Sequence, residues 1–174
     1  MKKLLTYITT LAALFLVSCA STSSVRLNHH KDQPTVAVMP LKGAYGEQAS
    51  DLISEQLALN GVPTVQRSQM NSILREHGYR GNRHFNQSSL VNYGKLLGVK
   101  KMLMGTISTV NGPLYSFDHA NITLKVVDVE TGRISWIGRY GNSMWTSAIS
   151  TQGDIQRGSK KIVEEFVKVH GTKF

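Results

Sequence analysis

Cysteine, acidic residues and long hydrophobic runs are scarce in this sequence. Cys19 is the only cysteine, so its thiol has no partner within the chain for a disulfide. The main apolar run, residues 4–17, is interrupted by threonines and a tyrosine. It is shorter than the roughly 20 apolar residues that a bilayer-spanning helix needs. The chain has 11 acidic residues against 20 lysines and arginines, a formal net charge of +9. This balance favours partners of opposite charge, such as acidic proteins, anionic lipid headgroups or anionic glycans.

Motifs for catalysis are missing as well. No serine lies in a Gly-x-Ser-x-Gly turn, and no Gly-x-x-x-x-Gly-Lys loop for phosphates occurs. The acidic residues have ordinary structural places, such as Asp51 and Glu55, one helical turn apart on an expected solvent face. His29, His30 and Asp32 carry metal-binding groups, but they lie in a stretch without a rigid frame. The sequence therefore predicts a non-enzymatic protein with no cofactor and no metal site.

The N-terminus has the features of an export signal with a lipid attachment site. Lys2 and Lys3 precede the apolar run, and Leu16-Val17-Ser18-Cys19 has the pattern of a lipobox, in which the cysteine is lipidated and the peptide is cut before it. No aspartate follows at the position that resembles an inner-membrane retention signal. We therefore expect a signal peptide over residues 1–18 and a lipoprotein that carries palmitate on Cys19. Its expected place is the periplasmic face of the outer membrane, where nucleic acid is not a partner.

The rest of the chain fits one folded domain on a short tether. Residues 19–33 contain the lipidated cysteine and a polar, flexible segment, and residues 34–174 are expected to form a single periplasmic domain. Apolar patterns predict strands over residues 35–41, 62–66, 99–110, 121–129 and 134–140. Helical spacing, with serine caps and glycine stops, predicts helices over residues 47–59, 68–78, 88–98 and 155–169.

The order of these elements, β-α-β-α-α-β-β-β-α, predicts an α/β (α+β) fold. It favours a single mixed sheet with helices packed mainly on one side. Residues 130–133, Glu-Thr-Gly-Arg, are typical of a tight hairpin turn, so the last three strands are expected to form an antiparallel meander.

One loop has the composition of a partner-binding surface. It combines arginine forks with aromatic rings, which give large contact energies at interfaces. A solvated connector whose aromatic rings tuck beneath it would have the same composition. A tryptophan after the meander has the same two interpretations, because it is an interface residue if exposed and part of the core if buried. The candidate partner-binding residues are Tyr79, Arg80, Arg83, His84, Phe85 and Trp145.

Four stretches of the domain resemble a known family. They are Val36–Pro40, Gln66–Leu74, Leu97–Ile107 and the most specific, Ile122–Trp136. Together they resemble the curli production assembly/transport component family and its relatives, which include the lipoprotein activator of a penicillin-binding protein. The resemblance covers nearly the whole domain, and its motifs are mostly structural.

The chain departs from both relatives. In the curli secretion channel, the resemblance implies long insertions that form membrane hairpins and a constriction loop after the first strand. Residues 108–120 are too short for two membrane strands of about 9 to 11 residues each, and residues 42–46 leave little room for a constriction loop. The resemblance therefore implies the periplasmic domain without the pore. The activator relative has a long disordered tether, whereas this tether is short.

These observations lead to three hypotheses of function. The first is a non-enzymatic accessory component that binds envelope proteins during assembly or secretion of a surface structure. The alternative is an activator of a peptidoglycan synthase, a penicillin-binding protein, and the third is a hydrolase that no motif reveals. Expected partners are proteins of the secretion, appendage or cell-wall machinery, and the family resemblance also implies self-association, because the family includes rings.

Overall fold

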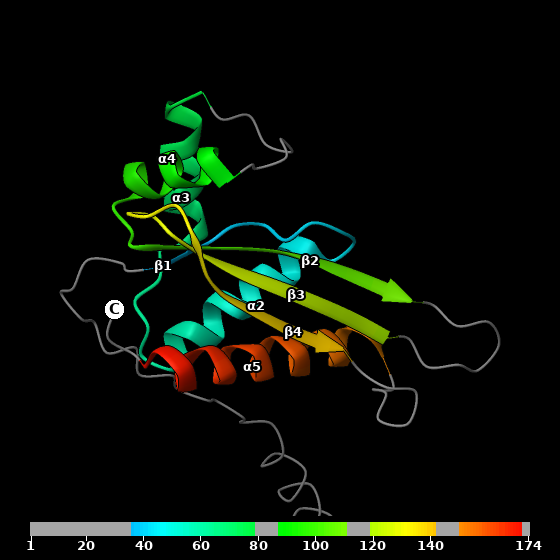
Figure 1. Cartoon of the computed structure of the whole chain (residues 1–174). Helices are drawn as coiled ribbons and strands as arrows, with labels where there is room; N and C mark the ends of the chain where they lie inside the picture. Colours follow the sequence, from blue (N-terminus) through cyan, green and yellow to red (C-terminus); the bar gives the residue numbers. More distant parts are fainter. Residues whose placement is uncertain (1–35, 79–86, 111–118, 142–149, 172–174) are drawn as a thin grey trace, which may run out of the picture.

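The computed structural model describes residues 36–78, 87–110, 119–141 and 150–171. Three helices follow the first strand, and a fourth ends the fold (Figure 1). Across these ranges, no helix has both the length and the apolar character needed to span a bilayer. The elements are β1 (Val36–Val38), α2 (Gly46–Leu59), α3 (Arg67–Glu76), α4 (Gln87–Leu97), β2 (Lys101–Val110), β3 (His119–Asp128), β4 (Ile134–Gly141) and α5 (Thr151–His170).

The strands form one mixed sheet in the order β1-β2-β3-β4. β1 is parallel to β2, and the other two pairs are antiparallel. The turn between β3 and β4 is fixed by Asp128, whose carboxylate accepts hydrogen bonds from the amide and the hydroxyl of Thr131 at 2.8 and 2.9 Å. Gly132 has φ 69°, which glycine adopts at little cost. The predicted α/β (α+β) class, the single mixed sheet and the antiparallel meander are confirmed.

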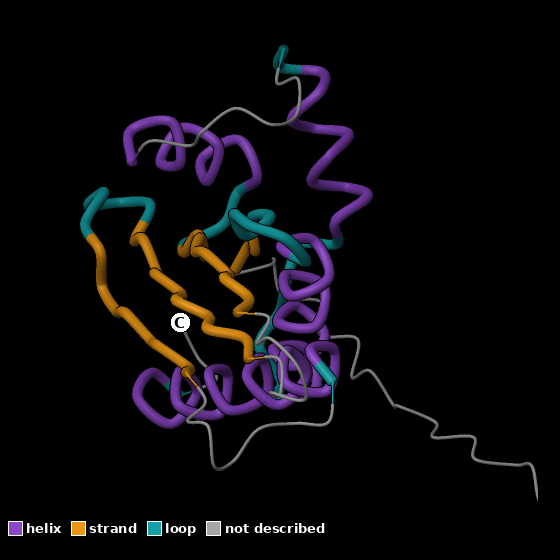
Figure 2. The backbone as a smooth tube through the Cα atoms, turned by 90° about the vertical axis from the view of Figure 1, so that its right-hand side faces the viewer, coloured by secondary structure: helices purple, strands orange, loops and turns teal. Residues whose placement is uncertain are grey.

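Two hydrophobic cores lie on opposite faces of the sheet. β3 alternates buried and partly exposed residues, which is the pattern of a strand with one closed face. On the closed face, α2 and α5 pack against Leu103, Ile122 and Leu124. On the other face, α3 and α4 pack against Met102 and Val127, at the end of the sheet near the β3–β4 turn. Figure 2 shows helices on both sides of the strands.

The described helices are thus divided between the two faces of the sheet, two on each. The expectation of helices mainly on one side holds for α2 and α5, whereas α3 and α4 lie on the opposite side. They cover only one end of that face, so the rest of it carries no helix in the described part of the chain (Figure 1). The candidate functional site lies in this uncovered region of the sheet.

The predicted strand over residues 62–66 is wrong. Val36 donates a hydrogen bond to the carbonyl of Pro63 at 3.2 Å and accepts one from the amide of Val65 at 3.0 Å, which forms a single parallel bridge at Thr64. Pro63 has no N–H to extend the ladder, and β1 itself is only three residues long. The segment is therefore a short connection from α2 to α3.

Candidate functional site

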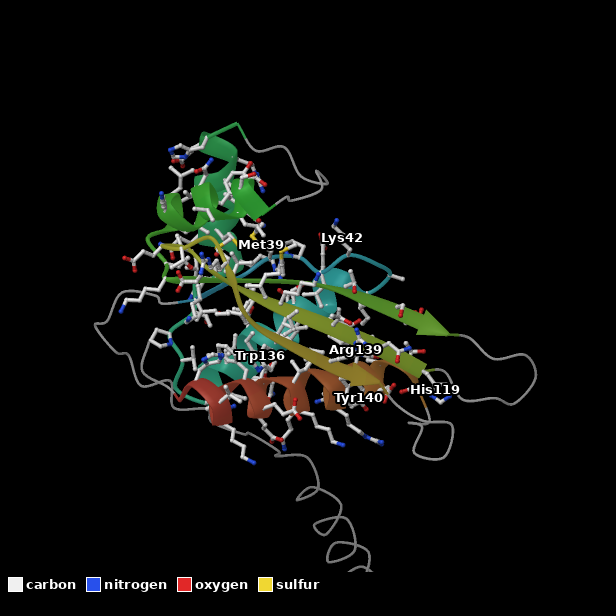
Figure 3. The ribbon with its side chains drawn as sticks, viewed as in Figure 1. Met39, Lys42, His119, Trp136, Arg139 and Tyr140 are labelled. Carbon is white, nitrogen blue, oxygen red and sulfur yellow. The ribbon has the colours of Figure 1, made fainter. Side chains whose placement is uncertain are left out.

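The residues predicted as a partner-binding loop lie outside the described residues, and so do Trp145 and Cys19. The other tryptophan, Trp136 in β4, is partly buried against the α5 core, with its ring centroid 5.5 Å from that of Phe166 (Figure 3). Trp136 therefore contributes to packing.

The most distinctive described surface is the uncovered part of the sheet, which we call the open sheet face. Strand register defines it, because residues directly opposite each other on paired strands point to the same side. One row runs from Lys42 through Thr106 and Thr123 to Arg139, and the next joins Met104, Lys125 and Ile137. The open sheet face comprises Lys42, Thr106, Ser108, Asn121, Thr123, Lys125, Ile137 and Arg139, with Met104 at its border, where it packs against the α3–α4 core.

All the charged side chains on the open sheet face are basic. Lys42 and Arg139, both labelled in Figure 3, are exposed. Lys125 is partly exposed. Neighbouring strands are about 4.8 Å apart, so Lys42 and Arg139 stand roughly 14 Å apart across the row. Threonine hydroxyls lie between them, and the side chain of Ile137 is 56% exposed. The face therefore combines separated cations, small polar groups and one apolar contact.

The cations of this face have no acidic partner within the described ranges. The ion pairs found there are Arg67 with Asp51, Lys101 with Asp128, and Lys160 with Glu164. None involves Lys42, Lys125 or Arg139. Their charges are available to a ligand of opposite sign.

The β1–α2 loop beside this face is tightly built. Lys42 donates from its amide to the carbonyl of Gly105 at 3.0 Å and accepts from the amide of Ile107 at 2.7 Å. Ser50, fully buried, accepts from the amide of Leu41 at 3.0 Å and donates to the carbonyl of Gly46. These bonds hold the loop to β2 and to the first turns of α2.

The same loop holds Tyr45 in a strained conformation. Tyr45 has φ 64°, the left-handed region, which costs a non-glycine residue about 1–2 kcal/mol. Its side chain is 51% exposed, so burial of the ring offsets little of this cost. Strain of this kind concentrates at functional sites.

A cleft of about 890 Å³ lies along the loop and the first turns of α2. Tyr45 and Lys42 line it together with Glu47, Asp51 and Glu55. The carboxylates outnumber the single lysine, so this cleft has the opposite charge to the open sheet face.

A buried carboxylate ties the sheet to the last helix. Asp154, fully buried at the start of α5, accepts hydrogen bonds from the amide of Ala120 and the hydroxyl of Tyr140, each at 2.8 Å. Burial and the bond to Asp154 raise the pKa of Tyr140 to about 12. Asp154 therefore has a structural role. In the described part of the chain, no group of three or more His, Cys, Asp or Glu side chains is placed to hold a metal ion.

The sequence had a partial signal for the open sheet face. Residues 121–126 alternate Asn, Thr and Lys with Ile, Leu and Val, which marks one polar face of a strand. The register that aligns Lys125 with Lys42 and Arg139 comes from pairing between distant segments, and no local pattern contains it.

The fold and the open sheet face define a small α+β domain with a basic sheet surface. The family model of the peptidoglycan-synthase activator LpoB matches residues 46–141, more than half of the chain. The chain belongs to this family. The resemblance seen in the sequence is thereby confirmed, and the match is to the activator relative.

Solved structures show the same fold at low sequence identity. The LpoB C-terminal domain from Salmonella enterica is 17% identical, with a TM-score of 0.50 over 64% of this chain and 84% of that chain. The corresponding domain from Escherichia coli is 18% identical, with a TM-score of 0.50 over 67% and 89%. TolB from Acinetobacter baumannii is 10% identical, with a TM-score of 0.50 over 80% of this chain and 29% of that one. No curated protein sequence matches the chain.

Proposed function

We propose that this protein is a non-enzymatic activator of a peptidoglycan synthase, held at the outer membrane by lipid on Cys19. The observation that carries the proposal is the match of residues 46–141 to the peptidoglycan-synthase activator family. It supports the alternative hypothesis from the sequence better than the first one, an accessory of secretion or assembly. The envelope location that the lipobox predicts and the absence of catalytic motifs fit either role.

An activator acts by binding, and it needs no catalytic group of its own. It raises the activity of an enzyme if it binds the active conformation more tightly than the inactive one. Coupling free energies of this kind are about 1–3 kcal/mol, which corresponds to about 5- to 150-fold. A rigid sheet with an open, charged face is suited to such selective binding, because little conformational entropy is lost when it docks.

The lipid anchor on Cys19 limits the distance from the membrane at which the domain can bind its partner. Residues 20–33, if fully extended, reach about 50 Å at most. A flexible segment averages much less. The partner must therefore present its binding site near the membrane that holds the lipid.

Reconstitution tests the proposal. The lipidated protein in detergent is added to the purified peptidoglycan synthases of the same bacterium, and glycan polymerisation and peptide cross-linking are measured. We expect at least one synthase to be stimulated about fivefold or more. Cross-linking in intact cells gives an independent readout. If none is stimulated and the cross-linked partners belong to a secretion or appendage system, the accessory hypothesis replaces this one.

A further inference from the structure

The open sheet face offers a docking surface with a defined preference for its partner. Three cations from three separate segments, Lys42, Lys125 and Arg139, lie on one side of the sheet. The strand positions between them carry threonine, serine, asparagine, methionine and isoleucine, and no carboxylate. Every charged side chain of the face itself is thus basic, which favours a positive field above it.

The charges of the described domain are also segregated. Glu47, Asp51 and Glu55 gather along the cleft on α2, and α2 packs on the closed face of the sheet. An acidic partner is attracted to the open sheet face and repelled by the α2 cleft. The two surfaces together favour one orientation of approach, which is how complementary charges direct association.

The apolar part of the face selects among anionic ligands. Ile137 is 56% exposed. An anionic glycan presents mainly hydroxyl and charged groups to this side chain, whereas a protein surface can present carboxylates around an apolar patch.

We propose that the open sheet face is the docking site for an acidic surface of the partner protein, with carboxylates facing Lys42, Lys125 and Arg139 and an apolar group covering Ile137. This inference rests on the proposed function, since it takes the partner to be the peptidoglycan synthase.

Charge reversal tests the docking site. The test variant is Lys125→Glu/Arg139→Glu, and the control is Lys160→Glu/Lys168→Glu, which makes the same change in net charge on exposed positions of α5. Binding to the purified synthase is measured at about 50 and about 300 mM salt, where the Debye length falls from about 14 to about 6 Å. We expect the test variant to bind at least tenfold more weakly at low salt and to lose the salt dependence, whereas the control keeps both. Thermal unfolding of both variants confirms that they are folded.

A third variant separates a protein partner from an anionic polymer or membrane. Ile137→Ser removes the apolar contact without changing charge, and we expect it to weaken synthase binding about fivefold. Sacculi carrying anionic polymer, and vesicles of phosphatidylglycerol with phosphatidylcholine, are tested in parallel. If either binds tightly and loses binding on charge reversal while Ile137→Ser has no effect on the synthase, the face serves that ligand and the inference is overturned.

The two proposals fail in different ways. If the wild-type protein neither binds nor stimulates any synthase, the proposed function fails and the docking inference fails with it. If the wild-type protein stimulates a synthase and the charge-reversed variant does so equally at low salt, the function stands and only the docking site is wrong.

Discussion

At the scale of single residues, Tyr45 has an energetic cost that the fold does not explain. Glycine adopts φ 64° without the steric penalty, although it also raises the entropy of the unfolded chain. We expect Tyr45→Gly to leave the free energy of unfolding unchanged or to raise it by up to about 1 kcal/mol, measured by urea denaturation. The control, Glu55→Gly at an exposed position in the interior of α2, should lower it by about 1 kcal/mol. A loss of more than about 1 kcal/mol in Tyr45→Gly would show that the ring itself stabilises the fold.

Gly46 at the start of α2, with Gly61 past the end of that helix as a comparison, tests whether the β1–α2 loop is as tightly packed as its hydrogen bonds indicate. A Cβ on Gly46 would lie 1.9 Å from the carbonyl oxygen of Leu41, whereas a Cβ on Gly61 would meet nothing within 4 Å. We expect Gly46→Ala to cost about 3 kcal/mol, because backbone must move. Gly61→Ala, at φ 78°, should cost only about 1 kcal/mol. If chemical denaturation showed equal losses of unfolding free energy for the two variants, the loop backbone would be able to shift at little cost.

At the scale of elements, Asp154 connects α5 to β3 and β4. Asp154→Ala leaves the Ala120 amide and the Tyr140 hydroxyl without their acceptor, so we expect a loss of about 3 kcal/mol. Tyr140→Phe removes one bond and should cost about half as much. The double variant should cost less than the two single losses combined, because the residues share a bond. Fully additive losses would contradict the pairing.

The same pair predicts a pH dependence. The pKa of Tyr140 is raised from its ordinary value near 10 to about 12 by burial and by the bond to Asp154. A raised pKa in the folded state means that the neutral phenol is favoured, so its stabilisation is complete below about pH 10 and is lost as pH rises toward 12. The difference in stability between the wild type and Tyr140→Phe should therefore shrink over this range. A constant difference would show that the phenol is not held by Asp154.

Elements with local signals could be predicted from the sequence, and contacts between distant elements could not. The helix over residues 47–59 and the hairpin around residues 130–133 follow from apolar spacing and turn residues, and the structure has both. Residues 62–66 have a strand-like composition, but Pro63 and the short β1 limit them to one bridge. The open sheet face depends on register between β2, β3 and β4 and on where α3 and α4 stop covering the sheet. Strand register and helix coverage are both set by tertiary packing. The sequence around a single position such as Arg139 therefore does not predict that it lies on the open sheet face.

At the scale of the whole molecule, the charge and the proposed anchor act together. The chain has a formal net charge of +9, and two of its lysines belong to the predicted signal peptide. The mature protein is therefore still basic, and a basic protein on a short tether samples a small volume near one membrane. Confinement raises the local concentration of a partner within reach. Loss of the anchor should consequently weaken activation in cells more than it weakens binding in solution.

Replacing Cys19, the predicted lipidation site, separates these two effects. Without a thiol at position 19, the lipid cannot be attached, and the signal has no lipobox cysteine to be cut before. We expect Cys19→Ala to leave the membrane fraction or to be retained as uncleaved precursor, and the purified domain should still stimulate the synthase in solution. Ser21→Ala, beyond the lipobox, is the matched control and should stay with the outer membrane. Fractionation with mass measurement of the N-terminus distinguishes these forms. A processed Cys19→Ala protein that remained in the outer membrane fraction would show that something other than lipid holds the chain there.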